Sequence, residues 1–504
     1  MKNSETNLLR QVIKVHHDDN VAVAISTLTE GTTLPEEYGN ITLSQEIPKG
    51  HKLALKNLVK GDDVIKYGFV IGQATADINV GSHIHSHNLS TKLNGSETYH
   101  YDQEPAPLVD KTDMPTFMGY VRKNGNVGIR NDLWIINTVG CVNQSAKRIT
   151  DLCKKQFAGR ADEFVALTHP FGCSQLGDDL SNTRNLLSSL MQNPNAGGVL
   201  VIGLGCENNQ LSTLMSETKD IDTKKVRYFN SQEVDNEIEV GLEYVEELLN
   251  EMDNDVRTEV PVSKLTLGMK CGGSDGFSGL TANPVVGRIT DMLTQYGGRV
   301  ILTETPEMFG AEQVLMDRAC NKEIYTEIVD LVQEFKDYFI RNNQPIYENP
   351  SPGNKAGGLT TLEEKSLGAI QKGGKAIINE VIGYGKKAST GKGLTLLQAP
   401  GNDAVSSTAL SAAGANIILF TTGRGTPLGF PVPTVKISSN TDLATRKKHW
   451  IDFDSGQILT SDISIDESAE QLFTYLLEVA SGKKTNNEIN DNREISIWKN
   501  GVTL

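Results

Sequence analysis

Residues 270–284 read KCGGSDGFSGLTANP and lie between two segments of different periodicity. The preceding residues 264–269, KLTLGM, form a short apolar run that favours a buried strand. Residues 285–296, VVGRITDMLTQY, have the apolar spacing of a helix. Glycine lets a ligand approach the backbone closely, and the interleaved polar residues supply donors and acceptors. The stretch therefore predicts a ligand-binding turn at a strand end, with an ordinary surface turn as the alternative.

A similar order of strand, cysteine-bearing turn and helix occurs three more times. The three strand-like runs are LWIINTVGC (133–141), FVALTHPFGC (164–173) and GGVLVIGLGC (197–206), and each precedes a segment with helical spacing. Strands that alternate with helices are typical of a mostly parallel sheet whose faces are covered by helices. The sequence therefore predicts an α/β fold from about residue 117 onward.

Length and charge narrow the possible functions. A chain of 504 residues is long enough for two to four domains. Its formal net charge of −15 argues against a nucleic-acid binder, because phosphates require a basic surface. The sequence has no apolar run of membrane-spanning length and no signal-peptide core, so we expect a cytoplasmic protein. Six cysteines without a dense spacing pattern fit a reducing compartment.

The changes of pattern predict four segments. Residues 1–92 contain short β-like runs separated by turns and form a small all-β module. Residues 93–115 are polar, contain three prolines and predict a linker. Residues 116–256 and 257–504 both alternate strands with helices and predict two α/β domains.

Four cysteines end predicted strands and are candidate metal ligands: Cys141, Cys173, Cys206 and Cys271. In open α/β sheets, ligands bind outside the carboxyl ends of the strands, where these thiols would lie. A helix N-terminus also lowers the pKa of a nearby thiol and favours metal ligation. The alternative for each is a small residue that packs well. The chain has no C-x-x-C motif, so a structural zinc site is not expected.

Two groups of histidines are further candidates. His83, His85 and His87 alternate, so on an extended strand they would share one face. Neighbouring histidines would lie about 6.6 Å apart and the outer pair about 13 Å, so only two could share one ion. We predict a catalytic role for His85 and metal ligation by His87, or else a polar face of the β module. His169 precedes a strand-end cysteine and is a candidate general base, with a structural histidine as the alternative.

Charged and polar residues beside glycines predict a site for an anionic substrate. Arg130 and Arg424 could each hold a carboxylate through two hydrogen bonds. Glu304 and Glu307 follow another predicted strand and could be metal ligands, acid–base groups or exposed helix-start carboxylates. The predicted substrate contacts are Arg130, Asn131, Ser274, Asp275, Asn283 and Thr422.

Several long motifs together resemble the altronate/galactarate dehydratase family. They are GYVRKNGNVGIRND, HPFGCSQLGDD, GLGCENN, KCGGSDGFSGLTANP, ETPEMFGAE and FTTGRGTPLGFPVPTVKISSN. The resemblance covers nearly the whole chain and implies that the N-terminal module is a β-clip (SAF-like) domain. It also implies a Rossmann-like C-terminal domain, a homodimer (with a possible dimerisation role for the second domain), and iron as cofactor with Mn²⁺ as a possible substitute.

The resemblance implies a hydro-lyase of hexuronate breakdown. Length and the C-terminal motif favour members that convert D-altronate to 2-keto-3-deoxy-D-gluconate, with galactarate as the sister substrate. In such a reaction a base removes the C2 proton, and a metal stabilises the enediolate. We expect His169 as base, Arg424 on the carboxylate and iron among the thiols. Thiolates favour an iron–sulfur cluster, whereas imidazole and carboxylate favour a single Fe²⁺, and both possibilities stay open. The alternatives are a sulfolactate-type C–S lyase and a sugar-acid sensor without turnover.

Overall fold

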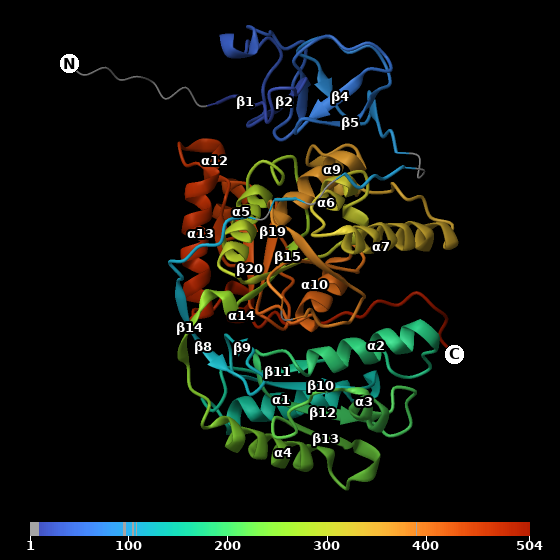
Figure 1. Ribbon diagram of the computed structural model, residues 1–504, viewed down its shortest axis with the longest axis vertical. Coiled ribbons are helices and arrows are strands. Elements are labelled where there is room, and N and C mark those ends of the chain that lie inside the picture. Colours follow the sequence, from blue (N-terminus) through green and yellow to red (C-terminus); the bar gives the residue numbers. More distant parts are fainter. Residues whose placement is uncertain (1–9, 94–96, 103–104, 107, 390) are drawn as a thin grey trace, which may run out of the picture.

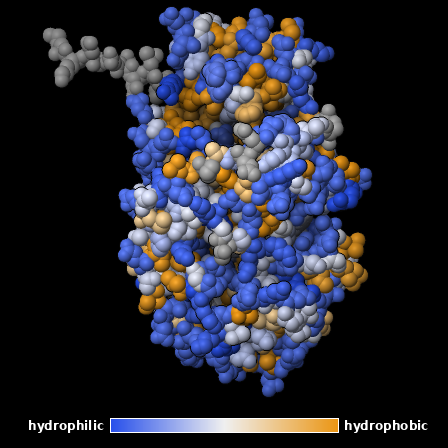
Figure 2. All heavy atoms as spheres, viewed as in Figure 1, coloured by the Kyte–Doolittle hydropathy of each residue, from blue (hydrophilic) through white to orange (hydrophobic). Residues whose placement is uncertain are grey.

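The computed structural model describes residues 10–93, 97–102, 105–106, 108–389 and 391–504. Along its long axis it has three parts, visible in Figure 1 as an N-terminal β module (blue), a C-terminal α/β domain and a second α/β domain. The C-terminal domain lies between the other two. Hydrophilic residues cover most of the face seen in Figure 2, in keeping with the charge of −15. No helix among the described residues is long and apolar enough to cross a membrane.

The N-terminal module is all-β, as the sequence predicts. Two small antiparallel sheets have the orders β1-β2-β3-β6 and β4-β5-β7. The strands are β1 (Val12–Ile13), β2 (Val21–Ala24), β3 (Lys52–Ala54), β4 (Asp63–Lys66), β5 (Phe69–Ala74), β6 (His83–Ile84) and β7 (Leu89–Ser90). They are short because turn residues, many of them glycines with positive φ, interrupt every run.

The expectation of one extended strand through the three alternating histidines is wrong. Strand β6 ends at Ile84, and the backbone carbonyl of His85 accepts hydrogen bonds from the amides of Asn88 (3.0 Å) and Leu89 (3.0 Å). This turn folds the chain back on itself. The rings of His83 and His87 therefore have centroids only 5.5 Å apart instead of the spacing of an extended chain.

The described part of the predicted linker is bound along the C-terminal domain. Tyr99 donates its hydroxyl to Glu312 (2.7 Å), and the amide of Lys111 donates to the carbonyl of Gln295 (2.9 Å). Residues 94–96, 103–104 and 107 of this segment lie outside the described residues.

The second domain contains a parallel sheet with the order β11-β10-β12-β13. The central strand β10 is buried at every position because it is packed on both faces. One face packs against α1 and α4, and the other against α2 and α3. The elements are β10 (Asp132–Asn137), α1 (Asn143–Gln156), β11 (Phe164–Leu167), α2 (Gly177–Leu190), β12 (Ala196–Gly203), α3 (Leu211–Glu217), β13 (Val226–Asn230) and α4 (Glu237–Met252).

An antiparallel strand pair joins the second and C-terminal domains. Strand β8 (Thr116–Val121) pairs with β14 (Thr258–Pro261), so the chain enters and leaves the second domain at adjacent positions. The short strand β9 (Val127–Gly128) completes this sheet on the other edge of β8.

The C-terminal domain has a seven-stranded, fully parallel sheet with the order β17-β18-β16-β15-β19-β20-β21. From β15 the chain runs to β16, then to the edge strand β17, and back to β18 between these two strands. It then crosses to the other side of β15 and adds β19, β20 and β21. This reversal beside β15 is the topological switch point of a doubly wound sheet. The strands are β15 (Thr266–Cys271), β16 (Arg299–Leu302), β17 (Ile378–Ile382), β18 (Gly393–Leu397), β19 (Ile417–Thr422), β20 (Thr434–Ser438) and β21 (Phe453–Asp454).

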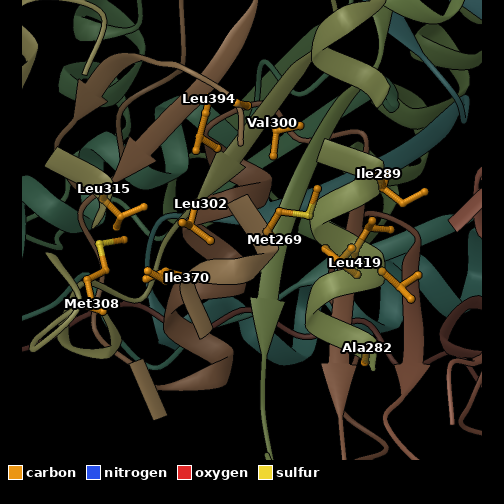
Figure 3. Close-up of a cluster of buried hydrophobic side chains, with 14 of the residues drawn as sticks. Met269, Ala282, Ile289, Val300, Leu302, Met308, Leu315, Ile370, Leu394 and Leu419 are labelled. Atoms are coloured by element: carbon orange, nitrogen blue, oxygen red, sulfur yellow. The ribbon is translucent and has the colours of Figure 1, made fainter. Parts of the chain in front are cut away.

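Helices cover both faces of this sheet. In Figure 3, Met269 and Leu419 from the strands meet Ile289 of α5 in the buried core. The same apolar cluster continues into the N-terminal module through Val64 and Ile71. The helices are α5 (Ala282–Gln295), α6 (Glu312–Met316), α7 (Lys322–Arg341), α8 (Pro352–Ala356), α9 (Leu362–Ala369), α10 (Asp403–Ala412), α11 (Thr441–Arg446), α12 (Gln457–Thr460), α13 (Ile465–Ala480) and α14 (Asn486–Ile489).

Candidate functional site

A cavity of about 600 Å³ opens at the carboxyl ends of β15, β16, β18 and β19. It therefore lies at the switch point of the sheet, where doubly wound proteins bind their ligands. Its lining residues are Cys271, Gly272, Gly273, Ser274, Pro306, Glu307, Phe335, Tyr338, Phe339, Asn349, Ser351, Gly353, Asn354, Lys365, Pro400, Gly401, Asn402, Asp403, Arg424 and Gly425. Many of these lining residues have amide, hydroxyl or charged side chains, which suits a small, highly hydroxylated molecule.

Cys271 lies at the inner end of the cavity beside two glutamates. Its thiol donates to Glu307 (Sγ to Oε2, 3.2 Å), and its backbone amide donates to Glu304 (3.1 Å). Burial raises the pKa of the Cys271 thiol to about 12, with Glu304 adding to the effect and nearby lysines opposing it. The thiol is therefore protonated at neutral pH and is not a preformed thiolate ligand.

Three buried lysines neutralise the two glutamates. Lys270 and Lys372 both form ion pairs with Glu304, the latter at 3.1 Å, and Lys365 pairs with Glu307 at 2.7 Å. Burial alone would raise the pKa of Glu307, but Lys365 and the other two lysines outweigh burial and lower it to about 2. Glu307 is therefore a carboxylate at neutral pH, held beside an ammonium group at the cavity wall.

This acid–base cluster (Lys270, Cys271, Glu304, Glu307, Lys365 and Lys372) does not suit a metal ion. The ligand atoms of Cys271, Glu304 and Glu307 do lie within 4.8 Å of one another. However, the Nζ atom of Lys372 is 2.9 Å from the thiol sulfur, and two further ammonium groups contact the carboxylates. A cation would have to displace these positive charges. The predicted role of Cys271 as a metal ligand is therefore disfavoured, and proton transfer suits the cluster better.

Two predicted substrate-site residues line the cavity. Ser274 follows β15, and Arg424 follows β19 on the facing side. The exposed guanidinium of Arg424 donates one hydrogen bond, to the carbonyl of Gly353 (3.2 Å), so other donors remain for an anion.

Three other predicted contacts hold the surrounding loops instead of lining the cavity. The buried carboxylate of Asp275 accepts hydrogen bonds from Ser278 (3.0 Å), Ser439 (2.8 Å) and Asn440 (3.0 Å). Asn283 donates to the carbonyl of Gly368 (2.9 Å), and Thr422 accepts from the amide of Gly425 (2.9 Å). Since the polar groups of these side chains are engaged within the protein, they shape the site and do not reach into it.

The predicted substrate contact by Arg130 is contradicted by its surroundings. Its guanidinium forms a buried two-point ion pair with Glu488 (2.7 and 3.0 Å), and donates to the carbonyls of Ile129, Val479 and Lys483. All five N–H groups are thereby used. Asn131 is also buried, and its amide oxygen accepts from Arg122 (2.8 Å). Neither residue lines the cavity described above.

His169 is a structural histidine and not a free base. It is 2% exposed, and its Nε2 donates to the carbonyl of Asn137 (2.8 Å) while its Nδ1 accepts from the amide of Phe171 (3.2 Å). Burial lowers its pKa to about 4. Because both ring nitrogens are occupied, the predicted general-base role is contradicted.

The four predicted thiols do not gather at one point. Cys141, Cys173 and Cys206 are exposed and follow the adjacent strands β10, β11 and β12 of the second domain, whereas Cys271 is buried in the C-terminal domain. Among the described residues, none of the three exposed thiols belongs to a set of three possible metal-ligand atoms within 4.8 Å. The turns do contact each other, since the amide of Gly140 donates to the carbonyl of Phe171 (2.9 Å).

His85 and His87 belong to a group of four imidazoles between the β module and the C-terminal domain. We call His51, His83, His85 and His87 the histidine cluster. Ring centroids are 4.9 Å apart for His51 and His85, and 5.5 Å apart for His83 and His85. His51 and His85 also contact the backbone of α8, whose other residues Gly353 and Asn354 line the cavity.

Sequence reasoning missed the three lysines of the acid–base cluster and the cavity residues from the segment before α9. Lys270 is part of the glycine-rich stretch, but a lysine at the end of an apolar strand carries no signal of burial. Lys365 and Asn354 lie in a loop-rich segment without a clear period. The sequence did identify the pair of acids in TETPEMFG, Glu304 and Glu307, as candidates. In the structure both lie beside the thiol of Cys271.

A doubly wound domain with buried proton-transfer groups beside a polar cavity at its switch point defines an enzyme that acts on a small polar molecule. Three family profiles match the chain: "Altronate/galactarate dehydratase SAF domain" over residues 10–92, "D-galactarate dehydratase/Altronate hydrolase, second domain" over 119–253, and "D-galactarate/Altronate dehydratase, C-terminal" over 262–503. The chain belongs to the D-galactarate/altronate dehydratase family.

Relatives match almost from end to end. The chain is 47% identical to an altronate dehydratase of Bacillus subtilis, covering 98% of this chain and 100% of the relative. It is 49% identical to an altronate dehydratase of Escherichia coli, again covering 98% and 100%. A galactarate dehydratase (L-threo-forming) of Escherichia coli is 35% identical, covering 94% and 93%.

Proposed function

We propose that this chain is a hydro-lyase that removes water from D-altronate and releases 2-keto-3-deoxy-D-gluconate. The observation that carries the proposal is the difference in identity between relatives. Identity is 47% and 49% with the two altronate dehydratases, but 35% with the galactarate dehydratase, over nearly the same length. Galactarate is therefore the second candidate substrate.

The cavity supports binding of a six-carbon polyhydroxy acid. Arg424 at its mouth supplies a guanidinium for the substrate carboxylate. Asn349, Ser351 and Asn354 line one wall. Asn354 is held in place by Ser351 (2.9 Å) and by the carbonyl of Ser274 (2.8 Å), so the amide of Asn349 and the hydroxyl of Ser351 are the groups offered to the substrate hydroxyls. Specificity for hydroxyl positions arises when such polar groups would be left unpaired by the wrong stereoisomer.

Glu307 and Lys365 are the residues that we propose to move protons. The Glu307 carboxylate takes the proton from C2, and the electron pair of the broken C–H bond passes into the enediolate. The C3–O bond then breaks, and Lys365 donates a proton to the departing hydroxide, which leaves as water. The resulting enol takes up a proton at C3, loses the proton of its C2 hydroxyl and so becomes the 2-keto acid. The 2.7 Å ion pair between the two side chains supports this assignment, because one proton shift between them resets both groups.

The family resemblance implies iron, with manganese as a substitute. A divalent ion, when bound, supplies Lewis-acid stabilisation for negative charge on the substrate. Two groups of side chains carry donors of the right type: the exposed thiols Cys141, Cys173 and Cys206, and the histidine cluster. In the part of the chain that the structure describes, neither group brings three ligand atoms within 4.8 Å of one another. The thiols favour an iron–sulfur cluster and the imidazoles a single ion, so the choice between these cofactors rests on which group binds.

Incubation of the purified chain with D-altronate, galactarate and sulfolactate, followed by assay of 2-keto acid and sulfite, tests the proposal. We expect a 2-keto acid from D-altronate at the highest kcat/KM. Faster turnover of galactarate would indicate that the chain is a galactarate dehydratase. Sulfite release from sulfolactate would indicate C–S lyase chemistry. No product from any of them under reducing, iron-replete conditions would favour a sugar-acid sensor.

Several predictions from the resemblance also belong to this proposal. The strand order β18-β16-β15-β19-β20-β21 supports a Rossmann-like C-terminal domain. The extents of the three family profiles support domain bounds near 1–92, 116–256 and 257–504. The homodimer and the place in hexuronate breakdown rest on the resemblance, and the cytoplasmic location rests on the sequence features given above. Light scattering of the purified chain tests the homodimer.

A further inference from the structure

One wall of the substrate cavity is aromatic and belongs to α7. Phe335, Tyr338 and Phe339 are spaced by three and four residues, so they lie on one face of this helix, and all three line the cavity. Phe335 is buried, whereas Tyr338 and Phe339 are half-buried. The ring centroids are 5.5 Å apart for Phe335 and Tyr338, and 6.0 Å apart for Phe335 and Phe339. Sequence reasoning did not identify this wall, because aromatic residues at helical spacing are also typical of a buried core.

The Tyr338 hydroxyl is the polar group of this aromatic wall. In the part of the chain that the structure describes, this hydroxyl has no hydrogen-bond partner. Two other tyrosines in the region differ, since the hydroxyl of Tyr99 donates to Glu312 (2.7 Å) and that of Tyr384 accepts from the amide of Trp498 (2.9 Å). A tyrosine hydroxyl that is taken out of bulk water normally finds a partner. The unpaired hydroxyl of Tyr338 is therefore available to a ligand in the cavity, as a donor and as an acceptor.

Trp498, near the end of the chain, packs against the aromatic wall. Its ring is stacked on Phe335 (5.4 Å between centroids, 17° between planes) and meets Tyr338 nearly edge-on (5.3 Å, 87°). Stacked and edge-to-face arrangements are the favoured geometries of aromatic pairs. Trp498 itself is not among the described residues that line the cavity. It therefore fixes the plane of the Tyr338 ring without contacting a molecule in the cavity.

The tail that carries Trp498 is attached to the second domain, where it runs beside α2 (Figure 1). The carboxylate of Asp179, in the first turn of α2, accepts hydrogen bonds from the amides of Asn500 (2.8 Å) and Gly501 (2.8 Å). Asp179 is 1% exposed, so these hydrogen bonds are shielded from water. The position of Trp498 is thus set from two sides, by the rings of α7 and by the attachment of the tail to α2.

We propose that Tyr338 binds a hydroxyl group of the substrate and that Trp498 is the positioning residue that orients Tyr338. This inference rests on the proposed function, in which Glu307 and Lys365 act at C2 and C3 and Arg424 holds the carboxylate. The hydroxyls at C4, C5 and C6 of D-altronate remain for the aromatic wall. The ring faces of this wall suit the C–H groups of the same carbons, since apolar surface beside a few placed polar groups is typical of small-molecule sites.

Steady-state kinetics of Tyr338→Phe, which removes only the hydroxyl, tests the contact. We expect kcat/KM for D-altronate to fall by about 3- to 10-fold, mainly through KM, because one neutral hydrogen bond to the substrate is lost. Tyr325→Phe makes the same change on α7 at a residue outside the described cavity lining, and it should behave like the parent. An unchanged kcat/KM in folded Tyr338→Phe would overturn the proposal.

Substrate analogues that lack the hydroxyl at C4, C5 or C6 identify the group that Tyr338 binds. Removing that hydroxyl from the substrate breaks the same hydrogen bond that Tyr338→Phe breaks in the protein. One of the three analogues should therefore be turned over by Tyr338→Phe at least as well as by the parent, while the variant remains slower with the other two. A variant that is equally impaired with all three analogues would contradict a contact to any of these hydroxyls.

A double-mutant cycle tests the positioning role of Trp498. Trp498→Leu removes the aromatic contacts and should lower kcat/KM for D-altronate by about the same factor as Tyr338→Phe, whereas Trp498→Phe, which keeps an aromatic ring, should retain most of the activity. Because Trp498 acts through the Tyr338 hydroxyl, Trp498→Leu should have little further effect in the Tyr338→Phe background. If the effects of the two substitutions multiply instead, Trp498 is only a packing residue and its positioning role is overturned.

Folding, function and the Tyr338 contact can be told apart. Circular dichroism and the Tm establish that each variant is folded. If the parent dehydrates D-altronate and Tyr338→Phe matches it, the contact fails and the proposed function stands. If the parent turns over no sugar acid, the proposed function fails, and calorimetric titration with D-altronate tests the contact alone. Weaker binding by Tyr338→Phe than by the parent would then support the contact, whereas equal binding or no binding would overturn it.

Discussion

Glu307 and Lys365 form the one ion pair of the acid–base cluster in which both partners line the cavity. Glu304 lies deeper and is shared by Lys270 and Lys372, so its charge stabilises the cluster from behind. Such an arrangement keeps a carboxylate ionised in a buried place without exposing it to water. The deeper groups, Lys270, Glu304 and Lys372, set the electrostatic environment of the site. The outer pair, Glu307 and Lys365, faces the cavity.

We expect Glu307→Gln to reduce kcat by about 10²- to 10⁴-fold with a smaller change in KM, because the amide cannot accept the C2 proton. Steady-state kinetics with D-altronate checks this split. Glu334→Gln, at an exposed glutamate of α7, is the matched control and should behave like the parent. An unchanged kcat in folded Glu307→Gln would remove this residue as the base.

We expect Arg424 to contribute to substrate binding and not to the chemical step. Arg424→Ala removes a charge-assisted contact to the substrate carboxylate, worth about 1.5–3 kcal/mol. We therefore expect KM to rise by about 10- to 100-fold while kcat changes little. Arg446→Ala, at an exposed arginine of α11, serves as the control. A fall in kcat at unchanged KM would place Arg424 in the chemical step and not in ground-state binding.

At the residue scale, the sequence predicted which residues belong to the site better than it predicted what each of them does. Cys271, Ser274, Glu307 and Arg424 were all identified as candidates, and they line one cavity. Arg130 was not separable from Arg424 by sequence, since both stand among glycines. Contacts with residues distant in the chain, above all the ion pair with Glu488, make Arg130 structural.

The segment that carries α8 and α9 is held by the β module. Glu364 in α9 accepts hydrogen bonds from Lys52 (2.9 Å) and Lys66 (2.8 Å), and all three side chains are completely buried. Lys365, the next residue, lies at the cavity wall. Since these lysines come from strands β3 and β4, the module positions one proton-transfer residue of a domain to which it is joined only by a long segment.

Replacing Glu364 should therefore weaken the whole seam. Glu364→Gln leaves two buried ammonium groups without their carboxylate, which costs about 3–5 kcal/mol in the free energy of unfolding. Urea denaturation measures this loss. The control is Asp110→Asn, which breaks the exposed pair with Lys392 and should change stability by less than about 1 kcal/mol.

Because of Glu364, the free energy of unfolding should also depend on pH. Burial would raise the pKa of Glu364, but Lys52 and Lys66 outweigh it and hold the pKa far below its usual 4.5. The folded state therefore binds fewer protons than the unfolded state, and this stabilisation is complete above about pH 5 and is lost as pH falls below 4.5. Unfolding free energies between pH 6 and about pH 3 should fall more steeply for the parent than for Glu364→Gln. Equal slopes would contradict this reading.

At the scale of elements, regular alternation was predictable and irregular segments were not. The strands before Cys141, Cys173, Cys206 and Cys271 follow from continuous apolar runs. The turn that breaks the histidine stretch depends on Asn88, whose side chain also accepts from the amide of His85 (2.9 Å), and a period-two pattern carries no sign of it. Likewise, α8 and α9 are fixed by contacts with the β module, which lies far away in the sequence.

Across the whole molecule, the last residues of the chain return to the second domain. Arg493 pairs with the buried Asp132 at 2.8 Å, and Glu488 pairs with Arg130 at 2.7 Å. Together with the β8–β14 strand pair, these contacts make the stability of the second domain depend on the chain segments before and after it. The prediction of consecutive domains gives their order but not this cross-connection, because ion pairs across such distances leave no local pattern.

Arg493→Met should destabilise the second domain selectively. Burial raises the pKa of Asp132 to about 6 even beside Arg493, so without that arginine the carboxyl group would be buried uncompensated. We expect a loss of about 3–5 kcal/mol and faster amide exchange in residues 119–253 than in residues 262–480. Hydrogen-exchange mass spectrometry measures both regions at once. Glu494→Gln, at an exposed residue of the same tail, is the control.

The return of the tail has a consequence for biogenesis. Asp132 and Arg493 are separated by 361 residues, so at about 5–20 residues per second a ribosome needs roughly 20–70 s to supply the second partner after the first. During that interval the nascent second domain holds a carboxylate and a guanidinium whose countercharges have not yet been translated. Completion of the second domain must therefore wait until Arg493 has been synthesised, and over this period the growing polypeptide becomes a natural client for chaperones.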